Sequence, residues 1–354
     1  MNILKLQNII KAENEALIIA SEVNRRYFTE FPSTDGFLVV TKNDAIFFTD
    51  SRYIEIAEKS VIGCSAKLLT RVSVEIVNYL KEKNIEKVLC EKERLTLSQF
   101  ENLKKALSPI KLVASNKLEN KINSLRITKS KDEVKKIIKA QRIAEDAFRH
   151  VLTFIKPGVT ERQIGLELDF YMLSHGAEAL SFETIAVTGA KTSMPHGVPD
   201  ETVVKDGDFV TMDFGAVVDG YHSDMTRTVG VGNISGQQKM VYNVVLQAQK
   251  EALASLKAGV TCKEADAKAR DIIKNAGYGE YFGHGTGHGV GIEIHENPSL
   301  SPRSEAVLKY GHIVTVEPGI YIPGKFGVRI EDMAYIKLNG CENLTNSPKE
   351  LIIL

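Results

Sequence analysis

The chain has 354 residues, of which 43% are hydrophobic and 25% are charged, an ordinary composition for a globular protein of about two domains. Lysine plus arginine and aspartate plus glutamate number 45 each, so charge gives no reason to expect nucleic acid or an anionic membrane as the main partner. No apolar run reaches the roughly 18 residues of a membrane span, and charged residues interrupt the N-terminus, which argues against a signal peptide.

The cysteines are scattered and form no C-x-x-C spacing, so they predict neither a zinc knuckle nor a redox motif. They are Cys64, Cys90, Cys262 and Cys341. Scattered cysteines in a chain of this length indicate reduced core residues, and they favour a cytoplasmic protein over a secreted one.

Short strands and helices alternate in residues 1–125, which predicts a small α/β domain. FLVV and AIFF flank a polar turn at 42–44, a pattern typical of a hairpin. Ser73 opens an amphipathic helix. The predicted strands of this domain are residues 37–40, 45–48, 87–90 and 110–114.

A helix start marks the domain boundary. Ser130 and Glu133 have the spacing of a capping box, and apolar residues then recur at helical spacing until Pro157-Gly158 stops the helix. We therefore place the boundary near residue 125, with a second domain over residues 126–354.

The second domain contains an internal repeat with a period of about 100 residues, too long for one solenoid unit. KPGVT at 156–160 returns as KAGVT at 257–261, and KDGDFVTMDFG at 205–215 returns as KYGHIVTVEPG at 309–319. The repeat aligns Asp213 with Glu317, and Asp224 and Glu331 follow them at comparable distances. We expect two half-domains related by a pseudo-twofold axis, with equivalent residues meeting at that axis.

Acidic residues end the apolar runs in both copies of the repeat. A single acid such as Asp213 is most often an exposed strand-end residue. A carboxylate in an apolar run is costly to bury unless it is paired or binds a metal, and acids at repeat-equivalent places favour the metal. Several carboxylates and a histidine suit two divalent cations that clamp an attacking water, and Mn²⁺ prefers such ligands, with Co²⁺ or Zn²⁺ as alternatives.

The stretch HGTGHGVG, from His284 to Gly291, combines histidines with glycines. Its glycines disfavour a helix and allow the backbone to approach a ligand closely. The stretch matches neither a dinucleotide fingerprint nor a phosphate loop, and the chain has no G-x-S-x-G nucleophile elbow. His196, His222 and His295 lie near the other motifs, whereas we interpret His150, His175 and His312 as ordinary surface or core residues.

The motifs VTMDFG, YHSDMTRT, HGTGHGVGIEIHE, TVEPGIY and VRIED together resemble the pita-bread metallopeptidases, which include aminopeptidase P, prolidase and methionine aminopeptidase. The preceding domain, with TDSRY at 49–53, resembles that of the aminopeptidase P and prolidase branch. The resemblance implies a creatinase/prolidase-like α/β domain over residues 1–125. It also implies an α+β pita-bread catalytic domain with a pseudo-twofold repeat over residues 126–354.

The resemblance also implies roles for individual residues. Two divalent metal ions would be held by Asp213, Asp224, His288, Glu317 and Glu331. His196 and His295 would stabilise the tetrahedral intermediate, His284 would line the site, and Glu317 would also shuttle a proton. Arg329 and Tyr321 would orient the carboxylates.

The implied reaction is hydrolysis of an Xaa-Pro bond. We expect an aminopeptidase that releases the first residue of peptides with proline in second position, because the arginine that many prolidases carry shortly after the H-E motif is replaced by Ser299-Leu300. The alternative is an Xaa-Pro dipeptidase, in which Arg303 or Lys325 would bind the C-terminal carboxylate. A metal-free creatinase-like enzyme and a non-catalytic peptide-binding module fit less well with an intact ligand set. The family implies a homodimer.

Overall fold

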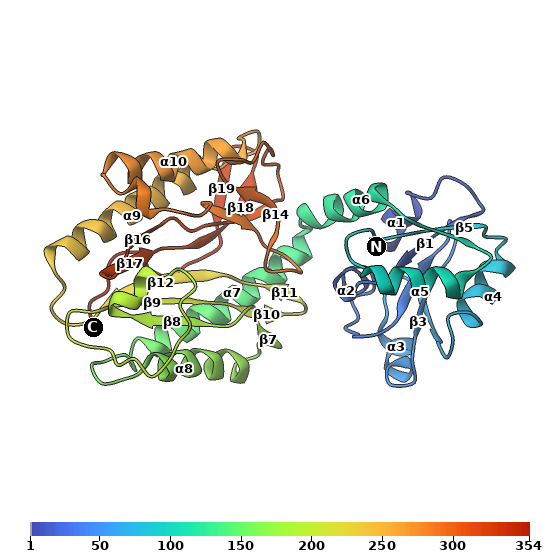
Figure 1. Ribbon diagram of the computed structural model, residues 1–354, viewed down its shortest axis with the longest axis horizontal. Helices are drawn as coiled ribbons and strands as arrows, with labels where there is room; N and C mark the ends of the chain where they lie inside the picture. Colours follow the sequence, from blue (N-terminus) through green and yellow to red (C-terminus); the bar gives the residue numbers. More distant parts are fainter. Residues whose placement is uncertain (1) are drawn as a thin grey trace. The chain divides into compact units, whose positions relative to one another are not determined.

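The computed structural model describes residues 2–354. The chain divides into two compact units, residues 1–125 and 126–354, which are described separately (Figure 1). Within residues 2–354, no helix has both the length and the apolar character needed to cross a membrane.

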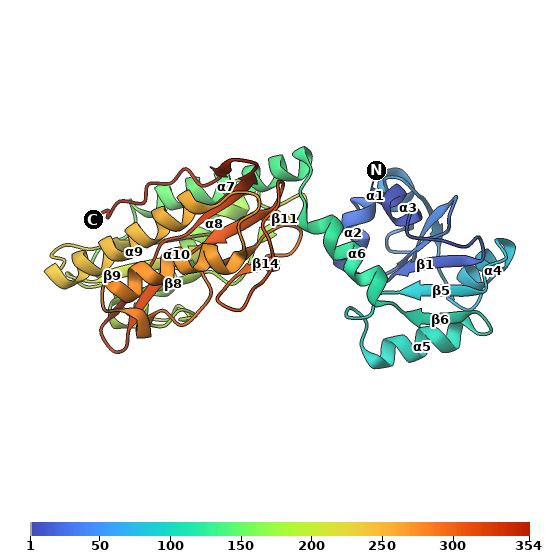
Figure 2. The ribbon, with the colours of Figure 1, turned by 90° about the horizontal axis from the view of Figure 1, so that it is seen from above.

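The N-terminal unit is built on a mixed sheet with the strand order β4-β3-β2-β1-β5-β6. The strands are β1 (Glu15–Ile19), β2 (Phe37–Val40), β3 (Ala45–Thr49), β4 (Ser65–Leu68), β5 (Lys87–Cys90) and β6 (Lys111–Ala114). The central strand β1 pairs antiparallel with β2 and parallel with β5, and four of its five residues are buried. Figure 2 shows β1, β5 and β6 in succession, with α5 beside β6. Such burial explains why β1, β2 and β3 consist of nearly continuous apolar residues.

Four helices of this unit, α2 to α5, connect strands of the sheet, whereas α1 precedes β1 and α6 follows β6. They are α1 (Asn2–Gln7), α2 (Glu22–Thr29), α3 (Ile54–Ser60), α4 (Glu75–Glu82), α5 (Leu97–Leu107) and α6 (Asn116–Ile127). The predicted hairpin is confirmed, because β2 and β3 pair antiparallel around the turn. The prediction that Ser73 opens a helix is wrong by two residues: α4 begins at Glu75, and Val74 at its N-cap makes no side-chain cap bond.

The C-terminal unit has two long helix pairs, α7 (Lys131–Val151) with α8 (Glu161–Ser174) and α9 (Gly236–Ser255) with α10 (Cys262–Asn275). The second helix of each pair begins with a capping box, at Thr160 and at Thr261, which are equivalent positions of the sequence repeat. The capping box predicted at Ser130 is confirmed, with the Ser130 side chain accepting from the Glu133 backbone. However, α7 ends at Val151, before Pro157.

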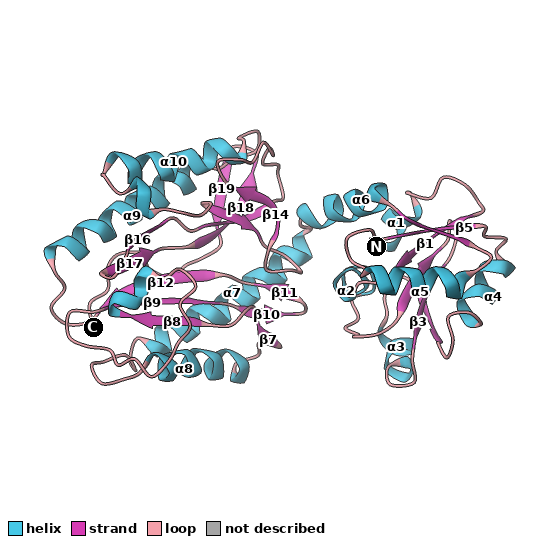
Figure 3. Ribbon diagram, viewed as in Figure 1, coloured by secondary structure: helices cyan, strands magenta, loops and turns pink. Residues whose placement is uncertain are grey.

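The helices pack against strands from both halves of the unit, and Figure 3 shows the strands running between the two helix pairs. The sheets have the orders β12-β9-β8, β14-β13-β15-β18-β19, β16-β17 and β11-β10-β7. The first half comprises β7 (Ala179–Leu180), β8 (Ile185–Thr188), η1 (Gly189–Ser193), β9 (Phe209–Phe214), β10 (Ala216–Val218), β11 (Tyr221–His222) and β12 (Met225–Gly230). The second half comprises η2 (Gly279–Tyr281), β13 (Gly287–Gly289), β14 (Glu296–Leu300), β15 (Ile313–Val316), β16 (Gly319–Ile322), β17 (Phe326–Arg329), β18 (Asp332–Lys337) and β19 (Gly340–Asn343).

Each half carries one antiparallel strand pair of the same kind, β9 with β12 and β15 with β18. Each pair packs in its own apolar cluster, which includes Phe148, Met212 and Phe214 in the first half and Tyr242, Val314 and Ile320 in the second. The two halves thus repeat a helix pair packed on a strand pair, as the sequence repeat predicts.

Candidate metal centre and active site

A cavity of about 840 Å³ lies within the C-terminal unit. It is lined by nine of the ten residues to which the resemblance assigns metal-binding, catalytic or orienting roles: His196, Asp213, Asp224, His284, His288, His295, Glu317, Arg329 and Glu331. The tenth, Tyr321, is buried and contacts two of the others through its hydroxyl group. The fold therefore brings together residues that are more than a hundred positions apart in the chain.

The two repeated strand pairs place the acids at equivalent points. Asp213 is on β9 opposite Thr226 of β12, and Asp224 comes directly before β12. Glu317 directly follows β15, and Glu331 directly precedes β18. The acids of each half thus lie at one end of a strand pair, where their carboxylates reach the same cavity.

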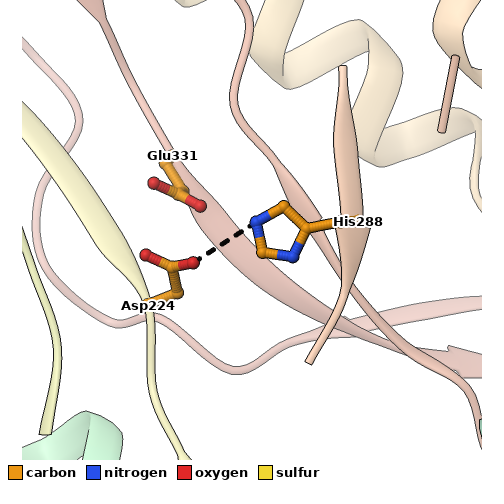
Figure 4. Close-up of side chains that lie close together, drawn as sticks. All are labelled: Asp224, His288 and Glu331. Atoms are coloured by element: carbon orange, nitrogen blue, oxygen red, sulfur yellow. Dashed lines mark ion pairs between the residues drawn. The ribbon is translucent and has the colours of Figure 1, made fainter. Parts of the chain in front are cut away.

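His288 faces these acids from the short strand β13 (Figure 4). Its Nε2 lies 3.5 Å from Asp224 Oδ2 and 3.3 Å from Glu317 Oε1. Asp224, His288 and Glu331 each offer one ligand atom, and these atoms lie within 4.8 Å of one another. Oxygen and imidazole nitrogen atoms at such separations suit a divalent cation.

Two carboxylate oxygens of the cluster have no hydrogen-bond donor among the described residues. They are Asp213 Oδ1 and Glu331 Oε1, and both are buried. A buried acceptor without a hydrogen-bond partner costs free energy, so these two oxygens indicate that the site binds a ligand such as a cation. The donor set of carboxylates and one imidazole therefore fits hard or borderline divalent cations.

Burial and mutual repulsion raise the pKa values of Asp224, Glu317 and Glu331. Burial is the main cause for Asp224 and Glu331, whose pKa values rise well above normal, and the neighbouring carboxylates add to it. The pKa of Glu317 is raised to about 7, mainly by burial. A bound divalent cation would be the largest local charge and would reverse this effect.

His288 is suited to a ligand role by its own environment. Burial lowers its pKa, which keeps the ring neutral. Its Nδ1 lies 3.0 Å from the carbonyl oxygen of Gly289, so that a proton on Nδ1 leaves the Nε2 lone pair facing the acids. The backbone nitrogen of His288 also donates to Thr315 Oγ1 at 3.0 Å.

Arg329 orients carboxylates of both halves from a buried position. Its Nη2 donates to Asp213 Oδ2 at 2.7 Å, and its Nε donates to Thr226 Oγ1 at 3.0 Å. Thr226 in turn donates to Glu331 Oε2 at 2.7 Å. Tyr321 accepts from Arg329 Nη1 at 3.0 Å, so the guanidinium group is held on three sides.

The remaining histidines line the cavity beside this cluster. His284 Nε2 lies 2.8 Å from the hydroxyl of Tyr321, and burial lowers the pKa of His284 to about 4. The ring of His295 meets that of His288 edge-on, with 4.4 Å between centroids. His196 and His295 are solvent-exposed within the cavity, where a substrate could reach them.

Sequence reasoning missed the threonines that hold the acids. Besides Thr226, Thr315 donates to Glu317 Oε1 at 3.1 Å. The repeat aligns Thr211 with Thr315, but Thr211 bonds to Thr228 instead. The only sequence signal was therefore the position of Thr315 two residues before Glu317, which alone does not distinguish a ligand-orienting threonine from a buried strand residue.

The cations considered for a substrate carboxylate lie outside the cavity lining. Arg303 and Lys325 are exposed, and neither is among the described residues that line the cavity. Arg162 at the start of α8 does line it and pairs with Glu201 at 2.6 Å. Part of the wall is apolar and includes Leu166, Phe182 and Ile294.

Comparison with known proteins identifies two matching families. Residues 135–337 match the model of metallopeptidase family M24, and residues 3–128 match the creatinase/prolidase N-terminal domain. The two matches correspond to the two compact units of the chain.

Whole-chain relatives carry proline-specific names. A Pyrococcus furiosus protein named Xaa-Pro dipeptidase is 38% identical, and the match covers 98% of this chain and 99% of that protein. The structure of a Bacillus anthracis Xaa-Pro dipeptidase superposes with a TM-score of 0.94 at 44% identity, covering 99% of each chain. The structure of a Thermotoga maritima X-Pro aminopeptidase gives a TM-score of 0.91 at 35% identity, covering 96% of this chain and 97% of the other. The chain therefore belongs to metallopeptidase family M24, in its pita-bread fold preceded by a creatinase/prolidase N-terminal domain.

Proposed function

We propose that this M24 metallopeptidase is an Xaa-Pro dipeptidase, which hydrolyses the bond between the first residue and proline. The sequence favoured an aminopeptidase with the dipeptidase as alternative, and the relatives reverse that order, since the Pyrococcus and Bacillus proteins are named dipeptidases. The observation that best supports a hydrolytic metal site is the cluster of Asp224, His288 and Glu331 in the cavity. One carboxylate oxygen of Glu331 is buried there without a hydrogen-bond donor among the described residues.

We assign the metal-holding role to Asp213, Asp224, His288, Glu317 and Glu331, and the number of ions to two. When bound, two divalent ions supply a Lewis acid and a water of lowered pKa at neutral pH. The carboxylate-rich set supports Mn²⁺ as the native ion, with Co²⁺ or Zn²⁺ as alternatives. Arg329 donates to Asp213 and Thr226 donates to Glu331, so the protein itself orients both carboxylates.

The histidines of the cavity bind the substrate carbonyl in this proposal. Burial lowers the pKa of His295, so its ring is a neutral hydrogen-bond donor. A neutral N–H of His295 or His196, directed at the carbonyl oxygen, stabilises the negative charge that develops there in the tetrahedral intermediate. His284, held by Tyr321, borders the same space.

Glu317 moves the proton. Its carboxylate lines the cavity and lies 3.3 Å from His288 Nε2, so it is placed to take a proton from the attacking water. It then gives that proton to the proline nitrogen as the C–N bond breaks, which yields a secondary amine and a carboxylic acid. Thr315 fixes the carboxylate of Glu317 for this transfer by donating to Oε1.

The cavity also supports selection of a short proline-containing substrate. Phe182, Ile294 and Leu166 provide an apolar wall against which the pyrrolidine ring can pack. A dipeptidase must also bind a C-terminal carboxylate. Arg329 is already engaged by Asp213, so Arg162 is the cation we assign to that carboxylate, since its pair with Glu201 is exposed and therefore weak.

A substrate panel tests the proposal. The metal-loaded protein is assayed with an Xaa-Pro dipeptide, the corresponding Xaa-Pro-Yaa tripeptide and the dipeptide amide. We expect activity confined to the dipeptide. Equal or greater activity on the tripeptide would favour the aminopeptidase, for which the Thermotoga structure is the supporting observation. Binding of all three without turnover would identify a non-catalytic peptide-binding module.

We further propose a cytoplasmic homodimer. No cysteine forms a disulfide within the described chain, which supports a reducing compartment. The dimer is inferred from the family alone, and sedimentation analysis of the purified protein tests it. A monomer at micromolar concentration would refute it.

A further inference from the structure

A buried ion cluster lies next to the cavity, outside the metal site. It joins Arg126, in the last turn of α6, and Lys129 to Glu293 and Glu296. The side chains of Arg126, Lys129 and Glu296 are 4%, 1% and 4% exposed. Two cations therefore meet two carboxylates, so the cluster is electrically balanced.

Glu296 is the centre of this ion cluster. Its Oε1 lies 2.7 Å from Arg126 Nη2, and its Oε2 lies 2.8 Å from Lys129 Nζ. Burial alone would raise the pKa of Glu296, but Lys129 and Arg126 lower it, so the carboxylate is charged. Because a buried carboxylate with two cationic partners is strongly held, Glu296 has a fixed position.

The ion cluster also closes the loop from Gly291 to Glu296. The Glu293 backbone nitrogen donates to Glu296 Oε1 at 3.3 Å, and Arg126 also pairs with the Glu293 carboxylate. The Gly291 backbone nitrogen donates to the Glu293 carbonyl at 3.0 Å. A Cβ atom at Gly291 would lie 2.5 Å from Glu296 Oε2, so only glycine allows the carboxylate to pack this closely.

His295 is the residue directly before Glu296. Its imidazole ring forms no hydrogen bond with any side chain or backbone group of residues 2–354. The ring contacts that of His288 edge-on. The direction of its ring therefore depends on the backbone of the loop. That backbone is fixed on one side by Glu296 and on the other by the Gly291 carbonyl, which accepts from the His222 backbone nitrogen at 2.9 Å.

We infer that Arg126 and Lys129 are positioning residues for His295: they fix Glu296, and Glu296 fixes the backbone that directs the imidazole at the substrate carbonyl. The inference rests on the role given to His295 under the proposed function. A hydrogen-bond donor misplaced by about 1 Å can lose about a hundredfold in rate, so loosening this ion cluster lowers turnover without removing a metal ligand.

The segment that carries the two cations is itself anchored to the strands. The Lys129 backbone nitrogen donates to the Gly311 carbonyl at 2.8 Å. Ser130 then caps α7. Residues 126–130 are therefore tied to the sheet and to α7 as well as to Glu296, so the cations are held in place rather than carried on a free linker.

A double-mutant cycle between Arg126 and His295 tests the inference. In the wild-type background, we expect Arg126→Gln to lower kcat about tenfold, with KM changed less than about threefold and metal content unchanged. In the His295→Ala background, the same substitution is expected to change kcat less than about twofold, because the residue through which Arg126 acts is gone. Arg126→Lys, which keeps the charge, is expected to restore most of the lost turnover.

The matched control is Arg142→Gln, which breaks a partly buried pair with Glu145 in the same unit, away from the cavity. It is expected to leave kcat unchanged in both backgrounds. Equal losses for Arg126→Gln in the two backgrounds, or no loss at all, would overturn the positioning role. If Arg126→Gln does not fold, Lys129→Met decides by the same comparison. A normal kcat for His295→Ala would instead overturn the proposed role of His295 itself.

Discussion

Arg329 Nη2 lies 2.7 Å from Asp213 Oδ2, while the second oxygen of Asp213 is buried with no hydrogen-bond donor in the part of the chain that the structure describes. One oxygen is thus oriented by the protein, and the other is left for a ligand. Glu331 repeats this arrangement, with Oε2 held by Thr226 and Oε1 without a donor. In each half of the repeat, one carboxylate thus has one oxygen held by a hydrogen bond and the other oxygen available to a metal ion.

Arg329→Lys is expected to weaken metal binding by about 10- to 100-fold, because lysine keeps the charge but cannot hold Asp213, Thr226 and Tyr321 at once. Titration of the metal-free protein with Mn²⁺, followed by calorimetry, measures the change. Arg303→Lys, at an exposed arginine outside the cavity, is the control. Unchanged Mn²⁺ affinity in a folded Arg329→Lys protein would show that the guanidinium group does not orient the ligands.

Arg162→Gln is expected to raise KM for an Xaa-Pro dipeptide about 10- to 100-fold, because a charge-assisted contact to the substrate carboxylate is worth about 1.5–3 kcal/mol. KM for the corresponding amide, which has no carboxylate, should change little. Glu201→Gln removes the competing partner of Arg162 and should leave the dipeptide KM equal or lower. Equal effects of Arg162→Gln on dipeptide and amide would exclude Arg162 as the carboxylate ligand.

His312 makes stability depend on pH below neutrality. It is 4% exposed, and its pKa is lowered to about 4, first by burial and then by Lys129 and Lys309. A histidine with a lowered folded pKa stabilises the protein above its unfolded pKa of about 6.5 and loses that contribution as pH falls towards 4. Between pH 7 and 4.5, the free energy of unfolding should therefore fall by roughly 2 kcal/mol more in the wild type than in His312→Gln. The free energy of unfolding is measured by urea denaturation at each pH. The same dependence on pH in both proteins would contradict this assignment.

The sequence predicted the acids of the site because a repeat reveals equivalence without coordinates. Asp213 and Glu317 were paired by the aligned runs VTMDFG and VTVEPG, and the structure places both in one cavity. The N-cap role of Ser130 was predictable from local spacing, because a capping box depends on residues three positions apart. Local spacing and internal repetition are properties that a sequence displays directly.

Contacts between distant segments were not predictable. Thr226 orients Glu331 because β12 brings it beside the segment before β18, and no spacing within the chain shows this. Arg126 meets Glu296 across 170 positions. The strand β4 was missed because its residues are mostly exposed or half-buried and lack the apolar run that marks β2 and β3. The central strand β1 was also missed, although four of its five residues are buried. Arg303 and Arg162 look alike in sequence, and only the fold shows which one lines the cavity.

The metal content and turnover of Asp224→Asn provide the most direct test of the hydrolytic metal centre. Asp132→Asn, which alters an exposed aspartate paired with Lys135, is the matched control. Elemental analysis should find two divalent ions per chain in the wild type and in Asp132→Asn, and removal of the ions by a chelator should abolish activity that Mn²⁺ restores. Asp224→Asn should bind fewer ions and show no measurable hydrolysis of an Xaa-Pro dipeptide, because a carboxylate shared by the cluster has lost its charge. Near-normal turnover by Asp224→Asn with two bound ions would contradict the assignment of this cluster as the catalytic metal site.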